Sequence, residues 1–289
     1  MNILTFDIED WFHILDNNST RNEPDWANYK SRLNQNLETI LTLLRENNQT
    51  ATFFCLGWIA KKYPLAIREI IKAGHEIGTH SHLHQLVYQQ SRSDFKDDLL
   101  QSIQILEDVT GKKISIYRSP GFSINKSCLW AFEILIQAGI TTDCSIFPAS
   151  RAHGGLPAIS LSEPFKLYTG SGFIKEFPMS TYRLGPLRFV FSGGGYFRIF
   201  PFRAIKWLMS QSKYTMTYFH PRDFDPDQPI LPDLTAIRKI KSYYGLSTSL
   251  SKLSELIKEF DFYSLEEADE KIDWDLCKKV HIDQLIKVT

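Results

Sequence analysis

Three of the chain's eight histidines stand within five residues, in the segment 78–84 that reads GTHSHLH. Residues four apart share one face of a helical turn, so His80 and His84 could direct their imidazoles at one divalent metal ion. His82 lies between them and should point elsewhere, which favours a structural role. A solvated loop rich in histidine is the competing interpretation, because this spacing alone is only moderately specific.

A second group of candidate residues is acidic. Asp7, Glu9 and Asp10 place three carboxylates within four residues, directly after the apolar run 3–6. In barrels and doubly wound sheets the active site lies where strands end, and crowded carboxylates are costly unless a cation offsets their charge. A helix cap or a solvated turn would explain any single one of these acids. Their crowding therefore favours a site.

Arg118 and His220 each follow a further apolar run. An arginine in this position could orient a carboxylate that acts as a base, and a histidine at the same sheet edge could act as a general acid. Each residue also has a simpler explanation. An arginine before Ser-Pro-Gly can belong to a turn, and a lone histidine is more often structural.

The elements that must position these residues follow from hydrophobic periodicity. Short apolar runs alternate with segments of helical period, which predicts βα units and a mainly parallel sheet. Strands are expected at 3–6, 52–56, 76–79, 114–117, 140–144, 216–219 and 260–265. Helices are expected from 33 to an end near 47–48, and at 65–73, 95–106 with Ser93 as N-cap, 129–138 and 250–257.

The pattern predicts one domain over residues 1–289 with an interruption. Between about 148 and 213 the periodicity weakens into glycine, proline, serine and aromatic residues, including the run 192–196 (SGGGY). Such a composition indicates an irregular insertion rather than a second core. We expect this insertion to shape access to the site.

Composition excludes several classes of protein. Basic and acidic residues both number 33 in 289 residues, so no net positive field would hold a nucleic acid. The four cysteines are far apart and form no CxxC pair, which is typical of buried thiols in a reducing compartment. Neither a signal peptide nor a run of ~20 apolar residues is visible, so we expect a cytoplasmic protein without a transmembrane segment.

Taken in order, these motifs resemble the polysaccharide deacetylase family, carbohydrate esterase family 4, which includes chitin and peptidoglycan deacetylases. The resemblance spans roughly residues 1–145 and 214–266. Residues 80–84 fit the family's His-Ser/Thr-x-x-His motif, and 118–120 fit its Arg-x-Pro motif. The strand end at Asp143 and the pair Phe219-His220 resemble two further motifs. The opening FDIEDWF and the GGGYFR segment are similar to a bacterial subgroup found with exopolysaccharide synthesis.

The resemblance implies an α/β fold, a distorted (β/α) barrel of about seven strands. It implies Asp7 as base, His220 as acid and Arg118 as the residue that keeps Asp7 ionised and aligned. His80 and His84 would bind the metal with one acid. Because Ile8 replaces the second residue of the family's Asp-Asp pair, Glu9 and Asp10 are both candidates for that third ligand. Pro120, Asp143 and Tyr196 are expected to contact the substrate.

The expected function is that of a metal-dependent hydrolase that removes N-acetyl groups from an amino sugar in a polysaccharide, an oligosaccharide or a lipid-linked precursor. Zinc is the first choice of metal, with cobalt, nickel or iron as alternatives. A deformylase or cyclic-amide hydrolase on the same fold is one rival. A non-catalytic sugar-binding protein is another, with aromatic residues of the insertion stacked on sugar rings. Those aromatic residues could equally be core.

Overall fold

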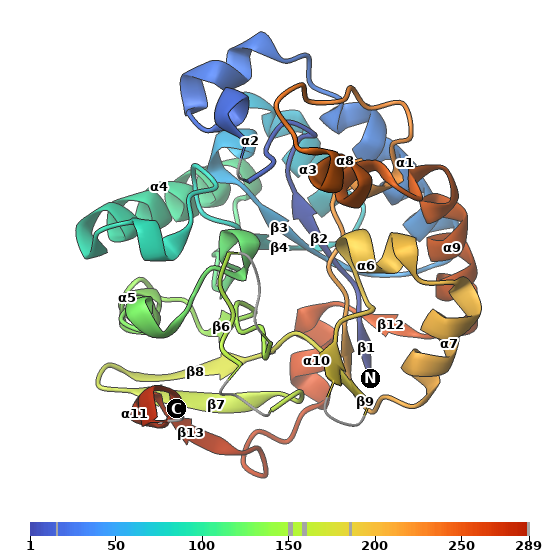
Figure 1. The fold of residues 1–289 in the computed structure, drawn as a ribbon. Coiled ribbons are helices and arrows are strands. Elements are labelled where there is room, and N and C mark those ends of the chain that lie inside the picture. Colours follow the sequence, from blue (N-terminus) through green and yellow to red (C-terminus); the bar gives the residue numbers. More distant parts are fainter. Residues whose placement is uncertain (16, 150–152, 158–160, 185–186, 288–289) are drawn as a thin grey trace.

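The computed structural model describes residues 1–15, 17–149, 153–157, 161–184 and 187–287. Its N-terminal half is a parallel sheet whose neighbouring strands follow chain order (Figure 1). Most of these strands are buried on both faces, which is why they read as apolar runs rather than alternating ones. They are β2 (Thr5–Ile8), β3 (Thr52–Cys55), β4 (Glu76–Thr79), β5 (Ile116–Tyr117) and β6 (Thr142–Asp143).

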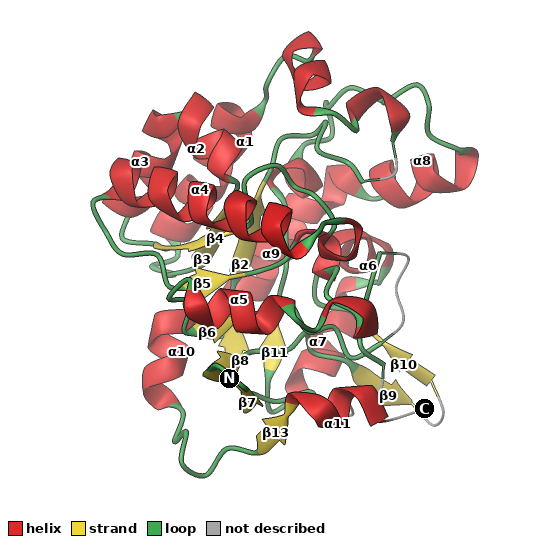
Figure 2. Cartoon of the chain, turned by 90° about the vertical axis from the view of Figure 1, so that its left-hand side faces the viewer, coloured by secondary structure: helices red, strands yellow, loops and turns green. Residues whose placement is uncertain are grey.

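Helices connect these strands and cover the sheet from outside (Figure 2). They are α1 (Leu33–Glu46), α2 (Gly57–Lys62), α3 (Pro64–Lys72), α4 (Arg92–Thr110) and α5 (Ala131–Gln137). The predicted N-cap of α4 is wrong by two residues. Ser91, rather than Ser93, accepts a hydrogen bond from the backbone N–H of Asp94 at 3.1 Å. The polar residues before the first apolar position masked this earlier start.

The sheet extends on both sides into an open barrel. Beyond β6 comes β8 (Gly172–Glu176), which is parallel to it, and β7 (Phe165–Thr169) and β13 (Lys279–His281) extend the edge. On the other side, β1 (Asn2–Ile3) pairs in parallel with β11 (Thr215–Met216) and with β12 (Phe262–Tyr263).

Seven strand segments therefore form an arc from 215–219, through β2 to β6, to β8. Among the described residues the ladder does not close. Side chains cross the gap instead: the Tyr214 hydroxyl donates to the carbonyl of Pro178 at 2.9 Å, and the backbone N–H of Met216 donates to Ser180 Oγ. The distorted barrel of about seven strands that the sequence predicts is confirmed.

The segment predicted to be an irregular insertion contains regular elements. Besides β7 and β8 it holds β9 (Tyr182–Leu184), β10 (Leu187–Phe189), α6 (Gly194–Ile199) and α7 (Phe202–Ser210). Residues 150–152, 158–160 and 185–186 of this range lie outside the described residues. The strands escaped prediction because they are short and each carries a lysine or arginine among its apolar residues. Gly193 runs so close to the segment after β11 that a Cβ there would lie 2.0 Å from the carbonyl oxygen of Tyr218.

The C-terminal part packs helices against the same barrel. They are α8 (Ala236–Tyr243), α9 (Leu246–Glu259), α10 (Leu265–Lys271) and α11 (Ile282–Lys287). Short 3-10 turns complete the fold: η1 (Asn18–Thr20), η2 (Glu23–Asn28), η3 (Val87–Gln89), η4 (Pro120–Phe122), η5 (Lys126–Cys128) and η6 (Pro221–Phe224). Within the described ranges, no helix has the length and apolar character to cross a bilayer.

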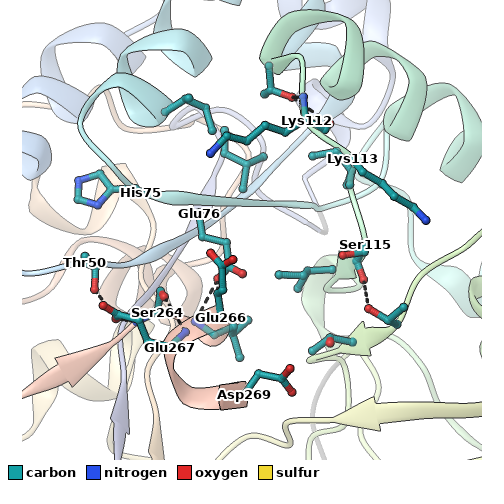
Figure 3. A pocket seen from close by; sticks show the side chains of 18 of the residues that line it. Thr50, His75, Glu76, Lys112, Lys113, Ser115, Ser264, Glu266, Glu267 and Asp269 are labelled. Atoms are coloured by element: carbon teal, nitrogen blue, oxygen red, sulfur yellow. Dashed lines mark hydrogen bonds between the residues drawn. The ribbon is translucent and has the colours of Figure 1, made fainter. Parts of the chain in front are cut away.

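A cavity of about 370 Å³ opens at the N-terminal ends of β4, β5 and β6 (Figure 3). Glu76 lies in its wall and holds the start of α10. Its Oε2 accepts hydrogen bonds from Thr52 Oγ1 at 2.5 Å and from the backbone N–H groups of Leu265 and Glu266 at 3.0 and 3.2 Å. Burial nevertheless raises the pKa of Glu76 to about 7. The folded protein thus binds a proton here more tightly than the unfolded chain does.

This raised pKa predicts a pH-dependent stability. The contribution is fully present below pH 4.5 and is lost as pH rises towards 7, because the unfolded carboxyl ionises first. Between these two pH values the wild type should lose unfolding free energy on the order of 3 kcal/mol. Glu76→Gln keeps an acceptor oxygen but cannot ionise, so we expect it not to show this loss. Urea unfolding at pH 5 and 7.5 would measure it, with exposed Glu270→Gln as control. Equal pH dependence in Glu76→Gln and the wild type would contradict the prediction.

Candidate active site

The candidate catalytic residues meet at the opposite end of the strands, around a cleft of about 570 Å³. Asp7 and Glu9 reach it from the end of β2, and His84 from the loop after β4. His220 follows β11. Because parallel strands present their carboxyl ends at one edge, residues more than 200 positions apart become neighbours.

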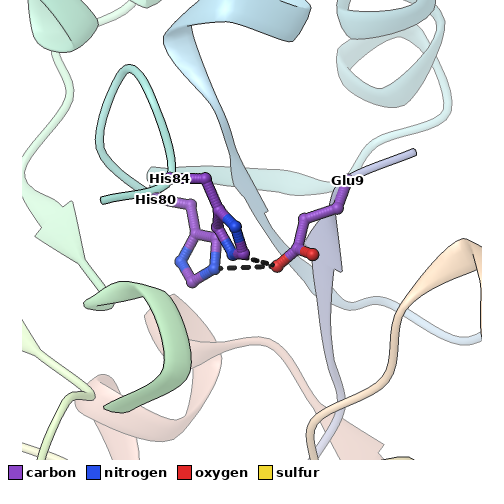
Figure 4. Close-up of side chains that lie close together, drawn as sticks. All are labelled: Glu9, His80 and His84. Atoms are coloured by element: carbon purple, nitrogen blue, oxygen red, sulfur yellow. Dashed lines mark hydrogen bonds and ion pairs between the residues drawn. The ribbon is translucent and has the colours of Figure 1, made fainter. Parts of the chain in front are cut away.

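Glu9, His80 and His84 form a group that could hold a metal ion (Figure 4). Glu9 Oε1 lies 3.2 Å from His80 Nε2 and 2.9 Å from His84 Nε2. Ligand atoms bound to one ion at about 2.0–2.2 Å stand roughly 3–3.5 Å apart, so both separations from Glu9 are close to those of bound ligands. All three ligand atoms lie within 4.8 Å of one another. All three residues are buried, which limits competition from bulk water.

The tautomer of His80 supports a cation in this position. Its Nδ1 lies 2.8 Å from the carbonyl oxygen of Arg118, which can only accept, so Nδ1 carries the proton. In neutral His80 the lone pair of Nε2 then faces a carboxylate oxygen of Glu9. Two acceptors in contact require a proton or a metal ion between them. A carbonyl that fixes the ring in this way is typical of metal-bound histidines.

His80 and His84 do not lie on a helical turn. The prediction that helical spacing brings their imidazoles together is therefore wrong. Residues 80–84 form a loop in which Ser81 and His84 adopt positive φ angles of 68° and 55°. Such angles are unfavourable for side-chain-bearing residues and persist where the surroundings hold them. Asp98 on α4 does so by accepting from the backbone N–H groups of His82 and Leu83 at 2.7 and 3.0 Å.

Of the two acidic candidates for the third ligand, the fold brings Glu9 to the histidines. Burial raises the pKa of Glu9, but the imidazoles of His84, His220 and His80 outweigh burial and hold the pKa well below its ordinary value. The expectation for Asp10 is corrected. Its Oδ1 accepts from the backbone N–H groups of Trp11 and Arg32 at 2.9 and 3.1 Å, so it shapes the turn after β2.

Asp7 is aligned by a buried arginine. Arg118 is fully buried, and its Nη1 donates to Asp7 Oδ1 at 2.8 Å and to Thr5 Oγ1 at 2.7 Å. Its guanidinium carbon lies 4.1 Å from the ring centroid of Phe54. These contacts fix one oxygen of Asp7, while Oδ2 faces His220 Nε2 at 3.9 Å. The carboxylate therefore presents a free oxygen to the cleft.

His220 is held by Asp223 and Arg198. Its Nδ1 lies 3.0 Å from Asp223 Oδ2, and Asp223 Oδ1 accepts from Arg198 Nη1. Burial lowers the pKa of His220, but the charges of Glu9 and Asp223 outweigh burial and raise it to about 9. This raised pKa favours the imidazolium form of His220, whose Nε2 is directed at Asp7 and Glu9. A proton donor and a carboxylate acceptor face one another across the metal-ligand group.

Of the three residues predicted to contact the substrate, one lines the cleft and two do not. Tyr196 lines the cleft and is 43% exposed. Asp143 is fully buried and accepts from the hydroxyl and the backbone N–H of Ser145 at 2.7 and 2.9 Å, so its prediction is corrected. Pro120 is also buried and lies outside the cleft lining, although its neighbours Gly121 and Phe122 belong to it.

Sequence reasoning missed Asp98, Arg198 and Asp223. Asp223 carried a recognisable signal, because an acid three residues after His220 fits a capping box, and the structure shows one at the start of η6. Arg198 had no such signal, since it stands 25 residues before Asp223 on a helix the sequence did not reveal. Asp98 has the sequence context of an ordinary helical residue, and its role appears only in its contacts with the loop 80–84.

Residues 3–141 match the family model for polysaccharide deacetylase. This N-terminal part of the chain is thus a polysaccharide deacetylase domain. Residues 144–270 match a second model, a domain of unknown function called DUF3473. The family model thus covers the strands that carry Asp7, Glu9, His80, His84 and Arg118, while His220 lies in the second region.

Curated relatives match the same N-terminal part of the chain. Two peptidoglycan-N-acetylglucosamine deacetylases of Bacillus cereus are 29% and 31% identical over 107 and 103 residues, each 36% of this chain and 39% and 46% of theirs. A peptidoglycan deacetylase of Helicobacter pylori is 27% identical over 107 residues, 37% of this chain and 36% of its own. The chain thus spans less than half the length of these curated relatives.

Solved structures match the fold over nearly the whole chain. A crystal structure from Mycobacterium smegmatis, described as a candidate polysaccharide deacetylase, is 21% identical with a TM-score of 0.67. It covers 96% of this chain and 92% of its own. A Bacillus anthracis protein described as a CE4 family pseudoenzyme is 15% identical with a TM-score of 0.50, and covers 97% and 69%. These likenesses support the fold.

Proposed function

We propose that this protein is a metal-dependent carbohydrate N-deacetylase that hydrolyses the acetamide of an amino sugar within a glycan. One observation carries the proposal: the Glu9, His80 and His84 group lies beside a carboxylate, Asp7, and an imidazole, His220, whose Nε2 is within 4 Å of both Asp7 and Glu9. Amide hydrolysis needs these parts together, namely a base for water, an acid for the amine and stabilisation of the carbonyl oxygen. A protein that only bound sugar would need neither acid nor base.

Glu9, His80 and His84 would hold the metal, which when bound supplies a Lewis acid for the carbonyl and makes water more acidic. Zinc suits two imidazoles and one carboxylate, with cobalt, nickel or iron as alternatives. Asp7 takes the proton of the attacking water through the oxygen that Arg118 leaves free. His220 donates its Nε2 proton to the departing amine, and Asp223 stabilises the imidazolium before this transfer.

The aromatic residues of the cleft suit a sugar ring. Tyr196 stands at the cleft and is partly exposed, whereas Phe191 and Phe197 are fully buried and belong to the core. A phenol ring with one free face can stack on the apolar face of a pyranose while its hydroxyl stays in water. Tyr196 is therefore the aromatic residue that we assign to substrate contact.

Product analysis tests this function. The purified protein, loaded with zinc or cobalt, is incubated with N-acetylglucosamine oligosaccharides, and acetate is quantified with and without a chelator. We expect acetate release that the chelator abolishes and that added metal restores. Parallel N-formylated oligosaccharides test the rival deformylase, in which formate would be the preferred product. Binding of the oligosaccharides without release of either acid would instead favour a sugar-binding protein.

The contact between Asp223 and His220 predicts a shift in the pH profile. A neutral amide at position 223 no longer favours the imidazolium, so Asp223→Asn should lower the pKa of His220. The alkaline limb of the kcat profile should then move to lower pH by about 1 unit, because the acid loses its proton earlier. Asp227→Asn removes an exposed carboxylate nearby and should leave the limb in place. A uniform loss of kcat at all pH values would contradict this role.

A further inference from the structure

The cleft contains more basic groups than its own acids neutralise. Its acids are Asp7, Glu9 and Asp223. Asp7 is paired with Arg118, and Asp223 accepts from Arg198. Glu9 faces the two histidines of the metal group. Each carboxylate of the cleft is therefore already engaged by a group described above.

The further cations that line the same cleft include Arg222 and Lys241. Within the part of the chain that the structure describes, neither has a carboxylate oxygen within 4 Å. The Nε of Arg222 donates to Gln228 Oε1 at 3.0 Å, and its guanidinium carbon lies 5.7 Å from the ring centroid of Tyr243. Its two Nη atoms make no hydrogen bond to a described residue. Arg222 is thus held in place with its terminal donors uncommitted.

This positive charge is a local feature of the cleft. The chain as a whole is neutral, with 33 basic and 33 acidic residues, so a generally basic surface does not explain it. Lys241 lies on α8 and is exposed, and its own carbonyl oxygen accepts from Arg198 Nη2 at 2.7 Å. Cations that converge in a cleft concentrate anions there, because the low-dielectric walls focus their field.

We propose that Arg222 and Lys241 form a subsite for an anionic group, a carboxylate or a phosphate, carried by the amino-sugar glycan. This inference rests on the proposed deacetylase function and narrows its substrate class. Arg222 directly precedes Asp223, which holds the ring that protonates the departing amine. A guanidinium fork binds both kinds of oxyanion, and the substrate decides between them.

The test compares three substrates that share the same N-acetylated sugar. One is a tetrasaccharide of alternating N-acetylglucosamine and glucuronic acid, the second is its carboxyl-reduced neutral counterpart, and the third is an N-acetylglucosamine disaccharide bearing a phosphodiester. We expect at least one anionic substrate to exceed the neutral one in kcat/KM by about 10-fold or more at low salt. This preference should shrink as ionic strength rises.

Charge reversal locates the subsite. Lys241→Glu should lower the ratio of anionic to neutral kcat/KM by about 10-fold, since it replaces attraction by repulsion. Lys239→Glu makes the same change on the same helix but outside the cleft lining, and should leave the ratio as in the wild type. The proposal would be overturned if the wild type had equal kcat/KM for all three substrates. It would also be overturned if Lys241→Glu and Lys239→Glu changed the ratio equally.

Binding separates this inference from the function on which it rests. If no substrate releases acetate, the proposed function fails, and calorimetric titration with the same three compounds still decides the subsite. Tighter binding of the uronate or the phosphodiester compound, weakened in Lys241→Glu and unchanged in Lys239→Glu, would support the subsite on its own. Equal binding of the neutral compound and both anionic compounds would reject it independently of catalysis.

Discussion

Asp7→Asn should lower the kcat of deacetylation by about 10³-fold while the protein keeps its metal. The amide can still accept from Arg118 Nη1, so the local packing is conserved, but it cannot take a proton from water. Loss of a positioned general base typically costs 10²- to 10⁴-fold. Acetate release under single-turnover conditions isolates the chemical step from product release.

Metal content of the same preparation is the control for Asp7→Asn. Asp7 lies outside the group of Glu9, His80 and His84, so we expect bound metal per chain to equal that of the wild type. A variant that keeps both its metal and its kcat would exclude Asp7 as the base. A variant that loses its metal would show that Asp7 is a ligand, which also contradicts the assignment.

Glu9→Gln should weaken metal binding by at least about 100-fold, because removal of even an outer partner of a metal ligand costs 10- to 100-fold. The neutral amide also loses the charge that the two imidazoles now face. At a metal concentration 100 times its Kd, binding stabilises a folded protein by about 2.7 kcal/mol. We therefore expect added zinc to raise the Tm of chelator-treated wild type by roughly 5 °C. Glu9→Gln should show no such rise.

Asp10→Asn is the matched control for Glu9→Gln. The two acids are adjacent in sequence, and both were candidates for the third ligand. Because Asp10 Oδ1 accepts from two backbone N–H groups, an asparagine can keep both hydrogen bonds. We expect Asp10→Asn to retain the zinc-dependent rise in Tm. The assignment of Glu9 fails if Asp10→Asn loses the rise and Glu9→Gln keeps it.

Much of the fold could be predicted because the deciding information is local. The strands at 52–56 and 76–79 are buried on both faces and thus carry continuous apolar runs, and α1 shows its apolar stripe in Leu37, Ile40 and Leu44. β8 could not be found in this way. Its sequence Gly-Phe-Ile-Lys-Glu mixes exposed and buried positions, and its place beside β6 depends on long-range pairing.

The candidate site could likewise be predicted only in part. By itself, the sequence determined which residue types could do chemistry and that strand ends would bring them to one edge, because side-chain identity and strand order are written along the chain. Only the tertiary structure decided between Glu9 and Asp10. In the turn after β2 one carboxylate lies at the histidines and the other accepts from the N–H groups of Trp11 and Arg32.

The contacts that hold His220 likewise depend on the tertiary structure. Asp223 is local to it, but Arg198 reaches that carboxylate from α6, and the excess of positive charge in the cleft exists only once α8 is folded over it. Spacing along the sequence cannot encode such contacts, since they arise from how separate elements pack. The sequence therefore determined the chemical groups available to this protein, and the packing of α6, η6 and α8 decided how those groups are oriented and charged.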